Sequence, residues 1–375
     1  MLYVLVAFLI SLAITLLLVR FNSLHGKYTA DHDVTSVQKY HARPVPRVGG
    51  ISVVVAMFGI WVLVALREPA QSSEFLTLLV VAMPAFLGGL AEDVTKRVRV
   101  LIRLGLAMLS GAAAYYFCGA TLTRLDIIGV DWLLQFSAIS LICTMIAIAG
   151  AANAINIIDG YNGLAAVISA MIFAGFAYVS YYLGDRLLLV AAVGMIGAIV
   201  GFLVWNYPRG LIFLGDGGAY FIGFMIGVIS VLMLARHPNV SAWFPLLLCI
   251  YPVFETLFSI YRKKFLRGQS PGMPDGVHLH MLIYKRLVRW AVGSSDARHK
   301  VQRNAMTSPY LWLLTSFAVI PAVLFWQNEY LLMFFVAAFS TTYVILYRKL
   351  VLFRMPKWLV IKKRAEIVRR GIKDK

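Results

Sequence analysis

The sequence predicts an all-α, polytopic membrane protein with about eleven transmembrane helices. Of its 375 residues, 61% are hydrophobic and only 14% are charged, and the mean hydropathy is +0.80. The charged fraction of a soluble domain is nearer about 25%. Apolar runs of roughly 20 residues, enough to cross about 30 Å of hydrocarbon, recur along the whole chain. Because the bilayer core offers the backbone no water, each run is expected to be a helix.

The apolar runs justify one span each. In chain order they lie near residues 1–19, 49–66, 75–91, 100–118, 134–152, 164–183, 187–205, 218–235, 241–260, 309–327 and 330–347. The first run has no Lys or Arg before Arg20 and no small-residue cleavage site, so we expect a retained span and not a signal peptide. We predict one multi-span domain over residues 1–348, with a long loop at 261–308 and a basic tail at 349–375.

Basic residues predict the orientation. With eleven spans, one set of connecting segments carries 31 Lys and Arg residues, whereas the other carries only Arg67, Arg124, Arg186 and Arg236. The positive-inside rule then places the N-terminus outside and the C-terminus in the cytoplasm. The net charge of +18 reflects this topology and attraction to anionic headgroups of the lipid bilayer, so no nucleic-acid partner is predicted.

Four carboxylates lie at the predicted cytoplasmic ends of apolar spans: Glu92, Asp93, Asp159 and Asp216. Facing lipid they would be costly, so we expect them in a cleft or bundle interior. The alternative for each is an interfacial charge or a helix cap. Asn153, Asn156 and Asp159 step by three, which keeps them on one broad face of a helix.

Carboxylates and amides at one interface favour a hard cation, because Mg²⁺ takes oxygen ligands and completes its shell with water and phosphate. Nearby bases, including Arg103, suit anions, and this mixture is typical of phosphoryl chemistry. The glycines around Asp216 allow close approach of a ligand, and the backbone N–H groups that start the next helix suit a phosphate.

Three stretches together carry a family resemblance: "NAINIIDGYNGLAA", "GFLVWNYPRGLIFLGDGGAYFIG" and "PDGVHLHML". They resemble the polyprenyl-phosphate N-acetylhexosamine-1-phosphate transferase family, with matching motif order from about Lys39 to Lys285. The family includes bacterial undecaprenyl-phosphate GlcNAc-1-phosphate transferases. Three positions depart from its pattern: Glu92 and Asn162 each stand where Asp is usual, and Leu279 separates two histidines that are usually adjacent.

The resemblance implies a multi-pass enzyme of the bacterial inner membrane, with its active site on the cytoplasmic face. Its donor would be a UDP-sugar, most simply of the GlcNAc type, its acceptor undecaprenyl phosphate and its cofactor Mg²⁺, with Mn²⁺ as the alternative cation. The reaction would release UMP and begin a cell-surface glycan. The family is compatible with a monomer or a homodimer.

The resemblance also implies a role for each matching residue. Glu92, Asp93, Asp159 and Asp216 are the predicted catalytic residues, with Asp93 orienting or deprotonating the lipid phosphate. Asp216, Asn156 and Asp159 are the predicted metal contacts. The predicted substrate-binding residues are Asn153, Asn156, Asn162, Asn206, Lys39, Arg47, Arg103, His278 and His280. For Lys39 and Arg47, positive-inside anchoring is an equal alternative, and for the two histidines the alternatives are a solvated pair or zinc.

Two rival functions remain open at this point. A lipid or sugar transporter would carry its ionisable residues near the bilayer midplane, often with inverted repeats. A non-catalytic family member would keep the bundle but not the carboxylates.

Overall fold

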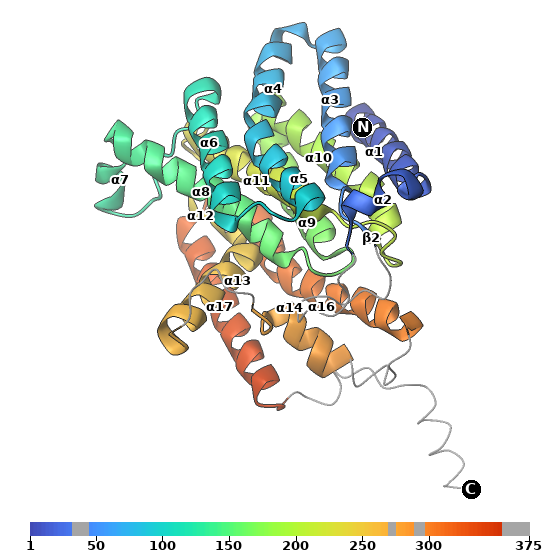
Figure 1. Cartoon of the computed structure of the whole chain (residues 1–375). Coiled ribbons are helices and arrows are strands. Elements are labelled where there is room, and N and C mark those ends of the chain that lie inside the picture. The colour runs from blue at the N-terminus through green and yellow to red at the C-terminus, as the bar shows by residue number, and fades with distance from the viewer. Residues whose placement is uncertain (32–44, 269–274, 289–296, 355–375) are drawn as a thin grey trace, which may run out of the picture.

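The computed structural model describes residues 1–31, 45–268, 275–288 and 297–354, which are almost entirely helical (Figure 1). This confirms the predicted all-α class. Among these residues, the short antiparallel strands β1 (Ala30–Asp31) and β2 (Val45–Pro46) form the only sheet. The helices are α1 (Leu2–Arg20), α2 (Asn22–Thr29), α3 (Gly50–Arg67), α4 (Pro69–Val81), α5 (Met83–Thr95), α6 (Val100–Cys118), α7 (Val130–Leu133), α8 (Ser137–Ile158), α9 (Leu164–Leu183), α10 (Arg186–Asn206), α11 (Gly215–Arg236), α12 (Trp243–Leu248), α13 (Ile250–Tyr261), η1 (Arg262–Leu266), α14 (Leu279–Ile283), η2 (Tyr284–Val288), α16 (Ala297–Leu324) and α17 (Glu329–Val351).

Ten helical segments of the described chain are long and apolar enough to cross a membrane, which confirms a polytopic membrane protein. They correspond to ten of the eleven predicted runs. Helices α4 and α5 together form one such segment, Pro69–Thr95. The two helices meet at Ala82, and Pro84 follows in the first turn of α5. In the first turn of a helix the backbone N–H has no partner within the helix, so a proline there costs no hydrogen bond.

The remaining predicted run, 241–260, is a bent helix made of α12 and α13, which meet at Cys249. Pro252 explains the bend. A proline ring clashes with the carbonyl group four residues earlier, which here belongs to Leu248. Hydropathy alone predicts a single straight span because it does not register this local clash.

The bent helix nevertheless runs from one end of the bundle to the other. Before α12, the backbone N–H of Ser241 donates to the carbonyl of Trp326, which precedes α17. After α13, Arg262 Nη1 lies 3.0 Å from the hydroxyl of Tyr347, near the end of α17. Helices α12 and α13 therefore lie along α17, and the described residues contain ten candidate spans where the sequence predicts eleven.

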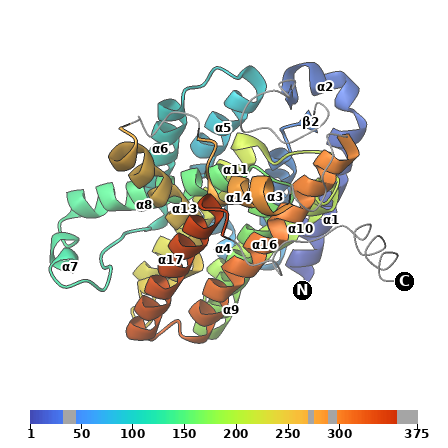
Figure 2. The ribbon, with the colours of Figure 1, turned by 90° about the horizontal axis from the view of Figure 1, so that it is seen from below.

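Helix α11 forms the centre of the bundle. Nearly all its side chains are buried, and α3, α5, α8 and α9 pack around it (Figures 1 and 2). Glycines allow the closest approach: a Cβ on Gly89 of α5 would lie 2.5 Å from the backbone carbonyl carbon of Asp216. This packing sets the end of α5, with Asp93, against the start of α11.

Two ends of the bundle differ in charge as the sequence predicts. Three of the four basic residues of the poorer set form ion pairs at one end: Arg124 with Asp126, Arg186 with Glu68 and Arg236 with Glu74. The opposite end carries Arg47 and Arg103 of the richer set, since α6 begins near Arg103 and ends at Cys118.

Reporter fusions test the orientation of these two ends. We expect a reporter fused after Lys375 to read as cytoplasmic and one inserted near Ser72 to read as external, because of the 31-to-4 distribution of Lys and Arg. Paired alkaline phosphatase and fluorescent-protein fusions make the measurement. Reversed labels would place the carboxylate-bearing end away from cytoplasmic nucleotides.

The predicted loop 261–308 is partly helical. Residues from both of its ends form η1, α14 and η2, and α16 begins at Ala297, well before the predicted span at 309–327. Several polar residues before the apolar part of α16 are buried, for example Asn304, Thr307 and Ser308. They face protein and not lipid, so a search for apolar runs misses them.

Candidate active site

Polar residues from distant parts of the sequence line one cavity of about 400 Å³. Its walls come from the ends of α5, α8 and α10 and the starts of α6 and α11, together with α14, α16 and the segment before α3. The lining residues that the sequence predicts are Arg47, Glu92, Arg103, Asn156, Asp159, Asn206, Asp216, His278 and His280. Asp93 lies directly behind this wall. The structure thus brings most of the predicted site together.

Asp216 stands in the first turn of α11 between two arginines. Gly215 begins the helix with φ of +78°, and a Cβ there would lie 1.9 Å from the carbonyl oxygen of Arg47, so the position requires glycine. This approach lets Arg47 Nη2 lie 2.8 Å from Asp216 Oδ1. Arg103 pairs with the other oxygen, Oδ2. Each oxygen of Asp216 therefore contacts a cation of the cavity wall.

Asp93 is buried, and both of its oxygens bind the start of α11. Oδ1 accepts from the backbone N–H of Asp216 at 2.9 Å, and Oδ2 accepts from that of Gly217 at 2.8 Å. A carboxylate is stabilised there by the helix dipole and by N–H groups that have no partner within the helix. The N–H groups that we predicted for a phosphate thus bind Asp93 in the structure.

Asn156 and Asp159 lie at the end of α8, which extends past the predicted run at 134–152. Asn153 and Asn156 are inside the helix, and Asp159 follows its last residue. The Asp159 carboxylate has no hydrogen-bonding partner among the described residues and faces the cavity. Burial raises the pKa of Asp159 to about 7, against the opposing influence of Arg47. Asn153 does not line the cavity.

The loop between α8 and α9 is held by amide side chains. Asn206 accepts from the N–H of Gly163 at 2.6 Å and donates to the carbonyl of Ile212 at 2.8 Å. Asn162 donates from its side chain to the carbonyl of Pro208 at 3.0 Å. These two predicted substrate-binding residues thus use their amides to hold the backbone beside Asp159, although Asn206 also touches the cavity.

Helix α16 clamps the same loop from the other side. Asn304 Oδ1 accepts from the N–H of Asn162, Ser308 donates to the carbonyl of Asn162, and Trp312 donates to that of Gly163. Sequence reasoning missed Asn304, Ser308 and Trp312, although their spacing of four places them on one helical face. A search for polar residues at helical spacing just before an apolar run would have found them.

The two histidines lie on α14 and just before it, and both line the cavity. Their rings are stacked, with centroids 5.2 Å apart and planes 6° apart. Tyr161 packs edge-on against His280. Among the described residues, neither ring nitrogen of His280 has a partner, and burial lowers the pKa of His280 to about 3. His280 is therefore neutral near pH 7, with hydrogen-bonding capacity left for a ligand.

Of the two remaining predicted residues, Glu92 and Lys39, the structure describes only Glu92. Glu92 lines the cavity, and its Oε2 also accepts from the N–H of Val98 at 2.7 Å, which closes the turn after α5. Lys39 lies outside the described residues, as does the tail from residue 355.

The cavity residues fit a hard divalent cation. Asp159, Asp216 and Asn156, which all carry side-chain oxygens, line one space, and the Asp159 carboxylate has no partner among the described residues. In the described ranges, no three His, Cys, Asp or Glu side chains are grouped closely enough to hold a metal by themselves. Mg²⁺ accepts such an incomplete set, because it retains waters and usually binds one or two carboxylates plus substrate phosphates.

Comparison with known proteins yields consistent matches. Residues 75–234 match the family model described as "Glycosyl transferase family 4". A Bacillus subtilis protein named "Probable undecaprenyl-phosphate N-acetylglucosaminyl 1-phosphate transferase" is 28% identical over 75% of this chain and 77% of its own length. A Thermotoga maritima protein named "Undecaprenyl-phosphate alpha-N-acetylglucosaminyl 1-phosphate transferase" is 27% identical over 72% of this chain and 78% of its own. An Escherichia coli (strain K12) protein with that second name is 28% identical over 68% and 69%.

Proposed function

We propose that this chain, whose residues 75–234 match the family model described as "Glycosyl transferase family 4", transfers an N-acetylhexosamine-1-phosphate from a UDP-sugar to undecaprenyl phosphate. GlcNAc is the proposed sugar, since the similar proteins carry it in their names. The product would be the first lipid-linked intermediate of a cell-surface glycan. The enzyme would work at the inner membrane with its cavity open to the cytoplasm.

The proposed reaction exchanges one phosphoanhydride bond for another. An oxygen of the lipid phosphate attacks the phosphorus that bears the sugar, and the bond from that phosphorus to the UMP oxygen breaks. UMP carries away the electron pair, and the lipid diphosphate retains the sugar. The second pKa of a phosphate monoester is about 6, so the nucleophile is mostly dianionic at neutral pH. Positioning and charge stabilisation therefore matter more than proton removal.

Residues of the cavity suit these demands. Arg47 and Arg103 lie on either side of Asp216 and would bind the phosphates of donor and acceptor. Asp159, Asp216 and Asn156 would hold Mg²⁺, which would supply positive charge for the phosphate oxygens. His280, neutral and unpartnered, would hydrogen-bond the donor.

One observation carries the proposal: carboxylates, arginines and histidines from six segments of the chain meet in a single cavity at one end of an apolar bundle. A bound UDP-sugar needs such a mixture, and the acceptor's polyprenyl chain needs adjacent lipid. A transporter would instead be expected to carry its ionisable groups near the bilayer midplane.

Membrane fractions containing the protein test the proposal directly. With undecaprenyl phosphate and UDP-GlcNAc labelled in the sugar, we expect label to enter the lipid fraction and UMP to appear in equal amount. EDTA should abolish transfer, and Mg²⁺ or Mn²⁺ should restore it. Parallel reactions with UDP-GalNAc and UDP-glucose determine the donor.

Membranes without the protein are the control. The proposed function is wrong if none of the UDP-sugars labels the lipid in the presence of metal. Transfer that persists in EDTA would contradict the metal assignment alone.

A further inference from the structure

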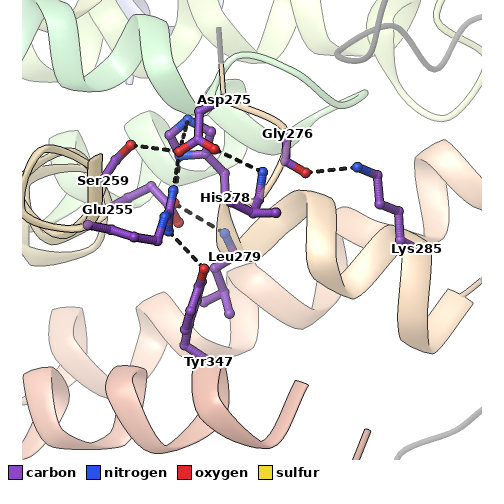
Figure 3. A network of polar contacts seen from close by, with 10 residues as sticks. Glu255, Ser259, Asp275, Gly276, His278, Leu279, Lys285 and Tyr347 are labelled. Carbon is purple, nitrogen blue, oxygen red and sulfur yellow. Dashed lines mark hydrogen bonds and ion pairs between the residues drawn. The ribbon is translucent and has the colours of Figure 1, made fainter. Parts of the chain in front are cut away.

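A buried polar cluster lies beside the cavity, between α13, the start of α14 and α17 (Figure 3). Glu255, Ser259 and Arg262 provide one side of it. They are spaced by four and three residues, so they share a face where α13 continues into η1. Asp275 and His278, from the segment before α14, provide the other side.

Glu255 is completely buried in an apolar helix, and one of its oxygens makes two contacts. Oε1 lies 2.8 Å from His278 Nδ1 and 3.1 Å from the backbone nitrogen of Leu279. A buried carboxylate is costly unless it is paired, so these contacts account for the presence of an acid here. An ionised carboxylate only accepts hydrogen bonds, so Nδ1 of His278 must carry a proton.

Asp275 lies near the other ring nitrogen of His278. Its Oδ2 is 3.9 Å from His278 Nε2, beyond hydrogen-bond distance, and it accepts from Ser259 at 3.0 Å and pairs with Arg262. Asp275 therefore has its own partners, and among the residues that the structure describes no hydrogen bond holds Nε2 of His278. Within these residues, Glu255 fixes the ring by a direct bond.

The fixed ring in turn forms part of the cavity wall. His278 lines the cavity and stacks on His280, whose two nitrogens have no partner in the described part of the chain. A rotation of the His278 ring would remove this stacking surface and change what the cavity presents to a ligand. The contacts thus run from Glu255 through His278 to the open edge of His280.

We propose that Glu255 is a positioning residue of this site, which holds His278 by its Nδ1–H and thereby sets the histidine pair that binds the anionic donor. This inference rests on the proposed function and adds a residue to it. The competing role for Glu255 is purely structural, through its contact with the backbone of Leu279. The two roles differ in whether the effect of Glu255 requires the His278 ring.

A double-mutant cycle with Glu255→Gln and His278→Ala separates these roles. Carboxylate partners of metal-ligating histidines commonly contribute roughly 10- to 100-fold to metal affinity or activity, and we take the same range for Glu255. We expect Glu255→Gln to lower kcat/KM for the UDP-sugar by about that factor, with membrane abundance and the melting temperature near wild type. In the His278→Ala background, Glu255→Gln should have almost no further effect, because a positioning residue has nothing left to position.

Tyr347→Phe is the matched control. It removes the hydroxyl that accepts from Arg262 in the same cluster without touching His278, so we expect wild-type kcat/KM. Glu255→Asp keeps the charge on a shorter side chain and should recover part of the activity. Glu255→Asp also replaces Glu255→Gln in the cycle if the amide variant fails to accumulate.

Two outcomes would overturn the inference: losses that multiply in the double variant, or equal losses in Tyr347→Phe and Glu255→Gln. Failure of the proposed function is recognised separately, because the wild-type protein would then transfer no sugar phosphate in the same assay.

Discussion

Asp216→Asn should lower kcat/KM for sugar-phosphate transfer by at least ~10²–10³-fold across the whole range from about pH 6 to about pH 9. The side chain pairs with Arg47 and Arg103 and faces the cavity beside Asp159. Its amide would lose a charged oxygen that the proposed Mg²⁺ needs and would leave the two arginines without their anion. Neither loss is repaired by raising the pH, so the pH–rate profile should keep its shape at a lower level.

Glu74→Gln is the matched control, since it removes an acid that is ion-paired with an arginine at the opposite end of the bundle. An exposed ion pair contributes little to stability, typically about 0–1 kcal/mol, so both activity and melting temperature should stay near wild type. Near-normal turnover of Asp216→Asn at saturating Mg²⁺ would contradict its assignment as a metal and anion residue.

Hydropathy predicts the bundle well because a spanning helix depends on the length and composition of a segment more than on its neighbours. Hydropathy does not predict helix boundaries that depend on a single residue or on buried polar side chains. Pro252 bends the predicted run at 241–260, and a search for apolar segments does not detect the buried polar residues that precede the apolar part of α16. The segment that carries Asn304 and Ser308 was therefore assigned to a loop.

The site could be predicted as a set of residues but not as a set of contacts. Arg47 and Arg103 are about 55 positions apart in the sequence and about 110 or more from Asp216, yet both pair with it. For Arg47 the reason is the close approach of its backbone carbonyl to Gly215, which no local pattern reveals. Similarly, Asn162 and Asn206 were predicted to bind substrate from their motifs, whereas their amides hold the backbone of the site.

For Glu255 the sequence indicates that a buried partner exists but does not identify it. The sequence reveals an acid within an apolar run, which already indicates a buried partner. Its partner His278 lies beyond a long loop, however, and the spacing of Glu255, Ser259 and Arg262 becomes meaningful only once the segment before α14 is seen to lie against that face.

Asp93→Asn should lower transfer by at least about tenfold, and the loss should not diminish as the pH rises. Both oxygens of Asp93 accept from the N–H groups of Asp216 and Gly217, so its contacts favour a role in holding the start of α11. An Asn side chain offers one oxygen and would turn its NH₂ group toward the second N–H. Loss of a helix-capping contact commonly costs about 0.5–2 kcal/mol, so the melting temperature should fall as well.

The pH–rate profile distinguishes this role from the base role that the sequence also allows for Asp93. If Asp93 mainly deprotonates the lipid phosphate, Asp93→Asn should regain rate above about pH 6, where the phosphate ionises without help. If Asp93 positions Asp216, the variant should stay low throughout, in parallel with Asp216→Asn. Both variants are measured beside the wild type from about pH 6 to about pH 9 at saturating Mg²⁺. A recovery of Asp93→Asn alone on the alkaline side would reject the positioning role, because a misplaced Asp216 cannot be restored by hydroxide.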